Sequence, residues 1–121
     1  MKNYILRKQI NEKGCYAEIF YDITIDEHAL NGTNITYNAD ERWETACKAG
    51  VIVFIEYFGP YLKGHLDITV YEIKWLPVDN NNLIVFFTTI KAMAEGLSLP
   101  SDKIKMELEN DCFVFPEIRS I

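Results

Sequence analysis

The stretch from Cys15 to Ile25 constrains the fold most, because its residues alternate between two faces. One face gathers the apolar set Cys15, Ala17, Ile19, Tyr21, Ile23 and Ile25, and the other gathers Tyr16, Glu18, Phe20, Asp22, Thr24 and Asp26. This period of two is typical of a half-buried β-strand. The preceding Tyr4–Ile10 favours a partner strand, and the polar loop between them predicts a hairpin; that loop is Asn11, Glu12, Lys13 and Gly14.

Two later segments favour helices. The first is capped by Asn38 or Asp40, has a face of Trp43, Cys47, Gly50 or Val51, Phe54 and Phe58, and ends at Gly59 and Pro60, although Val51–Phe58 also has strand propensity. The second carries a stripe of Leu83, Phe86, Phe87, Ile90, Met93, Ala94 and Leu97. Asp79 or Asn80 would cap it, and Gly96 would take the left-handed position near its end.

The remaining segments complete an α+β pattern. After a polar stretch with a turn at Asn31 and Gly32, Gly64 opens a strand, Leu66–Trp75, whose shifting apolar set indicates a bulge or burial on both faces. Residues 104–109 and 112–115 favour a closing hairpin. The order predicts a two-layer sandwich, a mostly antiparallel sheet with two helices on one face. No repeat or linker divides the chain, so we expect a single domain, 1–121.

Composition bounds the function. A chain of 121 residues, 49% hydrophobic, can bury one core, and three widely spaced cysteines encode neither a disulfide framework nor a zinc site. The charged N-terminus, and apolar runs no longer than Val51–Ile55, predict neither export nor membrane insertion, so we expect a cytoplasmic location. A net charge of −6 disfavours general nucleic-acid binding, yet residues 1–14 carry +3 and the rest −9. These charges predict a basic tip on an otherwise acidic domain.

The order of several motifs along the chain resembles that in domain IV of elongation factor G and of the ribosomal protection proteins. Arg7–Ile19 is similar to the first hairpin of that family, with Gly14, Tyr16 and Ala17 in its Gly-x-Tyr-Gly/Ala positions, although Ile10 and Asn11 replace a glycine pair. The segment WETACKAG resembles the family helix that reaches a lysine-x-glycine. Gly64 and the strand after it match the next region of the family loosely. The family's valine-aspartate loop and the helix after it then resemble the segments PVDNN and LIVFFTTIKAMAEG. The resemblance spans about Leu6 to Leu97.

The resemblance implies a sandwich with a left-handed βαβ crossover, an exception to the usual right-handed rule. It also implies that the first hairpin and the valine-aspartate loop lie together at a tip, which in the family enters the ribosomal decoding site. The partner-binding residues would then be Arg7, Lys8, Lys13, Gly14, Tyr16, Asp79, Asn80 and Asn81. The family's loop histidine is replaced by Leu76, and no GxxxxGK[ST] phosphate loop is present, so energy-coupled translocation is excluded for this chain.

The sequence therefore predicts a non-catalytic interaction module without a cofactor, whose partner is a ribosome or structured RNA, or else a protein. His28 and His65 lie far apart, and no Ser/His/Asp or Cys/His order is present. Simpler interpretations stay open: the basic hairpin protects a sheet edge, and Asp79, Asn80 and Asn81 only cap a helix. The alternatives are a small enzyme or nucleotide-binding protein on this fold, and a homodimer joined through a sheet edge.

Overall fold

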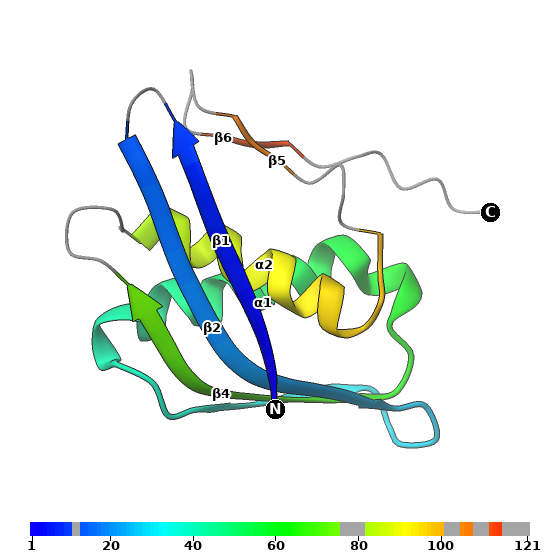
Figure 1. Ribbon diagram of the computed structural model, residues 1–121. Helices are drawn as coiled ribbons and strands as arrows, with labels where there is room; N and C mark the ends of the chain where they lie inside the picture. The colour runs from blue at the N-terminus through cyan, green and yellow to red at the C-terminus, as the bar shows by residue number, and fades with distance from the viewer. Residues whose placement is uncertain (11–12, 76–81, 101–104, 108–111, 115–121) are drawn as a thin grey trace.

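The computed structural model describes residues 1–10, 13–75, 82–100, 105–107 and 112–114 (Figure 1). Within these residues the strands and helices follow one another in the order β1 (Lys2–Ile10), β2 (Lys13–Asp26), β3 (Gly32–Tyr37), a 3₁₀ turn (Glu41–Trp43), α1 (Glu44–Phe58), a second 3₁₀ turn (Gly59–Tyr61), β4 (His65–Trp75), α2 (Asn82–Gly96), β5 (Lys105–Glu107) and β6 (Cys112–Val114).

The main sheet has the strand order β1-β2-β4-β3. β2 lies antiparallel to both β1 and β4, whereas β3 lies parallel to β4, to which α1 connects it. Both helices cover the same side of this sheet (Figure 1). β5 and β6 form a separate antiparallel pair. The predicted fold class is confirmed: the structure is an α+β sandwich of a mixed sheet and two helices, while the left hand of the β3–α1–β4 crossover stays an expectation.

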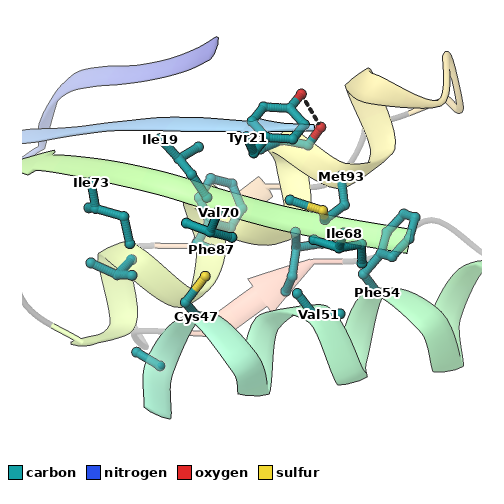
Figure 2. Packing of buried hydrophobic residues seen from close by; sticks show 14 of the residues in the cluster. Ile19, Tyr21, Cys47, Val51, Phe54, Ile68, Val70, Ile73, Phe87 and Met93 are labelled. Carbon is teal, nitrogen blue, oxygen red and sulfur yellow. Dashed lines mark hydrogen bonds between the residues drawn. The ribbon is translucent and has the colours of Figure 1, made fainter. Parts of the chain in front are cut away.

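The core fills the space between the sheet and the helices. Among its buried residues are Ala17, Ile19, Tyr21 and Ile23 of β2, Cys47, Val51, Phe54 and Phe58 of α1, Leu66, Ile68, Val70 and Ile73 of β4, and Phe87, Ile90 and Met93 of α2. The buried Tyr21 hydroxyl donates a 2.6 Å hydrogen bond to the carbonyl oxygen of Ala92, which ties β2 to α2 (Figure 2). Burial raises the pKa of Tyr21 to about 12.

The first helix begins and packs as the sequence predicts. The Asp40 carboxylate accepts a 2.9 Å hydrogen bond from the backbone N–H of Arg42, so Asp40 caps the 3₁₀ turn that leads into α1. The predicted face of α1 is buried. Gly50 sits where α1 crosses α2, and a Cβ there would lie 2.8 Å from the carbonyl oxygen of Phe86. A glycine at this crossing lets the two helix backbones approach closely.

Three sequence expectations differ from the structure. The polar stretch expected to hold only a turn contains a strand, β3, which begins at Gly32. Gly96 ends α2 but is not the left-handed residue, since Ser98 has a φ of 57° and, among the described glycines, Gly64 alone has a positive φ. The predicted hairpin loop is shorter, because Ile10 already pairs with Lys13. Each error comes from a local signal that pairing or packing elsewhere overrides.

The predicted irregularity of β4 is a β-bulge. Glu72 pairs with Phe20 and Val70 pairs with Tyr21, so Tyr71 between them has no partner in β2. The bulge turns Tyr71 outward, where its hydroxyl donates a 2.7 Å hydrogen bond to the Asp22 carboxylate. The shift of apolar residues in the sequence therefore reflects one extra residue and not burial on both faces.

Candidate functional site

The hairpin at the end of β1 brings two predicted site residues together. Arg7 and Tyr16 are direct partners across β1 and β2, and the guanidinium carbon of Arg7 lies 5.4 Å from the centre of the Tyr16 ring. The Tyr16 hydroxyl donates a 3.1 Å hydrogen bond to the Glu18 carboxylate. Desolvation and this carboxylate raise the pKa of Tyr16, so the phenol stays neutral at physiological pH. The pair therefore offers a cation stacked on a neutral ring.

The other predicted residues are placed only in part. Lys8 lies on β1, paired with Cys15, while Lys13 and Gly14 lie at the start of β2. Their strand positions put them at the same end of the sheet as Arg7. The side chains of Lys8 and Lys13 lie outside the described part of the structure, as do Asp79, Asn80 and Asn81 together with the rest of residues 76–81.

The strand register shows which segments share this end of the sheet. Trp75, the last residue of β4, pairs with Ala17, one residue beyond Tyr16. β1 therefore ends, β2 begins and β4 ends at the same end of the sheet. The arrowheads of β1 and β4 point to this end in Figure 1. We call this end of the molecule the tip.

Two further cations stack on aromatic rings, one near the tip and one at the middle of β2, and the sequence did not reveal them. The guanidinium carbon of Arg42 lies 4.3 Å from the Trp75 ring centre and 5.9 Å from that of Trp43. The two indoles meet edge to face at 5.5 Å. Lys74 Nζ lies 5.1 Å from the ring centre of Phe20. Trp75 is half-buried: it packs against the core, and the Arg42 side chain lies over its ring.

The two histidines and Cys47 make separate contacts in the described part of the structure. The backbone N–H of the exposed His28 donates to the Asp26 carboxylate, and His65 Nε2 lies 3.8 Å from an Asp67 carboxylate oxygen at the end of the sheet opposite the tip. Cys47 is buried near Thr89, whose hydroxyl lies 3.5 Å from its sulfur. Among the described residues, no group of three His, Cys, Asp or Glu side chains is placed to hold a metal ion.

The Cys47 thiol is expected to be chemically inert in the folded protein. Burial raises its pKa to about 11, so almost no nucleophilic thiolate forms near neutral pH. In a Cys15→Ser, Cys112→Ser background, we expect Ellman's reagent to modify Cys47 only at the rate of unfolding. A burst of labelling before unfolding, measured by absorbance at neutral pH, would contradict this burial.

A small pocket lies at the end of the sheet opposite the tip. It has a volume of about 130 Å³ and is lined by the start of β3, the end of α1 and the loop before β4; among its residues are Gly32, Thr33, Ile55, Leu62 and Leu66. The pocket is mainly apolar and open to solvent.

No helix in the described part of the chain is long and apolar enough to cross a membrane.

Comparisons with known proteins support the fold and leave the family open. No family model matches the chain, and no curated protein matches it. Among solved structures, the crystal structure of a protein from Thermus thermophilus matches 78% of this chain with a TM-score of 0.58 and 14% sequence identity. The chain spans only 16% of the length of that protein. The α+β sandwich is therefore an arrangement that also occurs as part of a much longer chain.

Proposed function

We propose that this chain is a non-catalytic interaction module, related to domain IV of the elongation factor G family, that binds a macromolecule with its tip. One observation carries the proposal: Arg7, Arg42 and Lys74 come from three different elements, and each lies over an aromatic ring, two of these rings near the tip and that of Phe20 at the middle of β2. Rings paired with cations stack on nucleobases and attract phosphates. The hairpin motif and the order of later motifs support the family relationship.

Structured RNA, with the ribosome as the first candidate, is the partner that this chemistry favours at the tip. A protein partner is the second candidate, because residues 15–121 carry a net charge of −9, which repels phosphates from the rest of the molecule. Both partners would meet the same end of the sheet. Glu18 beside Tyr16 restricts how closely a phosphate approaches, so contact through bases fits the site better than contact with the backbone of a duplex.

The test is co-sedimentation of the purified protein with ribosomes at low and at physiological salt. We expect pelleting that survives physiological salt and is lost, at least tenfold, in the Arg7→Glu, Lys8→Glu variant. Each lost cation–phosphate contact should also lower the steepness of the salt dependence by about one. The matched control is Lys2→Glu, Lys63→Glu, which makes the same change in net charge at exposed positions away from the tip.

The outcomes separate the two partners. Pelleting of the wild-type protein and of the control, but not of the tip variant, supports RNA or ribosome binding by the tip. If the wild-type protein stays in the supernatant at both salts, the ribosome is excluded and a protein partner becomes the candidate. If both variants lose binding equally, overall charge and not the tip governs the interaction, and the proposed site is wrong.

A further inference from the structure

The sheet has two outer strands, and they differ sharply in their protection. An outer strand presents unpaired N–H and C=O groups that can pair with another chain, and proteins usually guard such edges with charges or prolines. β1 carries Lys2, Arg7 and Lys8. β3, with the sequence GTNITY, has neither a charged residue nor a proline, and within the described sheet it pairs with β4 alone. β3 is therefore the unguarded edge.

An uncovered apolar stripe of α1 lies above this edge. Gly50 packs against α2, so the opposite side of α1 faces away from α2. Ile52 and Ile55 share that opposite side, because residues three apart on a helix are neighbours. Ile55 lines the pocket together with Thr33 of β3, which places the stripe over β3. Ile52, near the middle of α1, has 54% of its surface exposed.

We propose that the β3 edge and the Ile52 stripe form an interface with a second copy of this chain. Two β3 strands would pair antiparallel about a twofold axis at Ile35 and continue the sheet across the axis. This register sets Ile35 opposite Ile35, Thr33 opposite Tyr37, and Asn34 opposite Thr36. Every pair then joins side chains on the same face of the sheet, without opposing like charges.

The same twofold axis also brings the α1 helices of the two copies together. Ile52 lies near the middle of α1 as Ile35 lies near the middle of β3, so the axis brings the two Ile52 side chains together above the joined sheet. The polar side chains around Ile52 are Glu44 and Lys48, whose carboxylate and Nζ lie 2.6 Å apart, and the exposed Glu56. Because the axis at Ile52 makes the two helices antiparallel, Glu56 of each copy lies opposite Lys48 of the other. Apolar burial with opposite charges facing each other offsets the repulsion between two chains of net charge −6.

The other outer strand is unsuited to a second copy. An antiparallel β1 pair centred on Ile5 would set Lys2 opposite Lys8, and like charges that face each other directly are destabilising. The β3 interface also leaves Arg7 and Tyr16 uncovered, since β1 and β2 lie on the far side of the sheet. The inference therefore does not depend on the proposed function.

Sedimentation equilibrium over a range of concentrations tests the interface. We expect the wild-type chain to approach twice its 14.1 kDa mass as the concentration rises. Ile52→Glu should stay at the mass of one chain, and so should Ile52→Lys, because each sets like charges face to face at the axis. An equimolar mixture of the two variants should regain the double mass. Ile5→Lys, which changes an exposed isoleucine of β1 that pairs with Glu18, is the matched control for Ile52→Lys and should dimerise as the wild-type chain does.

Three results would overturn the proposal. One is a wild-type mass that remains 14.1 kDa at every concentration, and another is dissociation by Ile5→Lys but not by Ile52→Lys. Hydrogen exchange of the wild-type protein supplies the third, without any variant: the β3 amides should become at least tenfold better protected between dilute and concentrated samples. Unchanged protection of residues 32–37 would exclude pairing at this edge.

Discussion

Replacement of Gly64 by alanine is expected to lower the free energy of unfolding by about 3 kcal/mol. The backbone at Gly64 has a φ of +107°, which side chains rarely adopt, and a Cβ there would lie 1.9 Å from the carbonyl oxygen of Asp26. The residue also joins the loop before β4 to the turn before β3, because its N–H donates to the Asn31 side chain and its carbonyl oxygen accepts from Gly32. Urea unfolding followed by circular dichroism measures the loss.

Gly59→Ala is the matched control for Gly64→Ala. Gly59 follows α1 with helical angles, a φ of −45° and a ψ of −42°, and a Cβ there would meet no atom within 4 Å. We expect this variant to be more stable than the wild-type protein by about 0.5–1 kcal/mol, because alanine restricts the unfolded chain. Equal destabilisation by both substitutions would show that local backbone geometry does not decide the role of Gly64.

The sequence predicts the elements whose pattern is strong and local. β2 alternates over its whole length. Of its predicted inner face, Ala17, Ile19, Tyr21 and Ile23 are buried and Ile25 is half-buried, while the side chain of Cys15 lies outside the described part of the structure. β3 lacks this signal. As an outer strand it buries little, and only Ile35 and Tyr37 are even half-buried, so its sequence resembles a polar loop. Its strand structure comes from pairing with β4, which lies more than thirty residues away in the chain.

The second helix is buried more widely than its predicted stripe. Thr88 and Thr89 are buried, and each hydroxyl donates to a carbonyl oxygen one turn earlier, Ile84 and Val85 respectively. These bonds satisfy the polar groups within the helix itself. α2 contacts both β2 and α1, so it is covered on two sides. A one-stripe pattern cannot reveal this second contact, because it depends on where α1 packs.

The contacts of the candidate site could likewise be predicted only in part from the sequence. Arg7 and Tyr16 follow from the hairpin, since a short connection fixes which residues oppose each other. Arg42 is a different case, because its contact with Trp75 joins the start of α1 to the end of β4. No spacing in the sequence indicates it. A search for cations near aromatic residues would have found too many candidates, and only the packing of α1 on the sheet selects this pair.

Replacement of Phe54 by alanine is expected to have the largest effect of all, a loss of about 3–5 kcal/mol in the free energy of unfolding. Phe54 is completely buried, and Figure 2 shows its ring rising from α1 towards β4. The ring also packs 5.3 Å from that of Phe58. Its removal takes away apolar contact with both layers and leaves a cavity that the sheet and the helices can fill only by moving closer together.

Glu56→Ala is the control for Phe54→Ala, because Glu56 lies on the exposed side of the same helix. We expect this variant to stay within about 0.5 kcal/mol of the wild-type protein. Both are measured by urea unfolding at one low protein concentration, so that association of two copies does not add to the apparent stability. A loss below about 1 kcal/mol for Phe54→Ala would mean that the layers close over the cavity, and that α1 is not held by this ring.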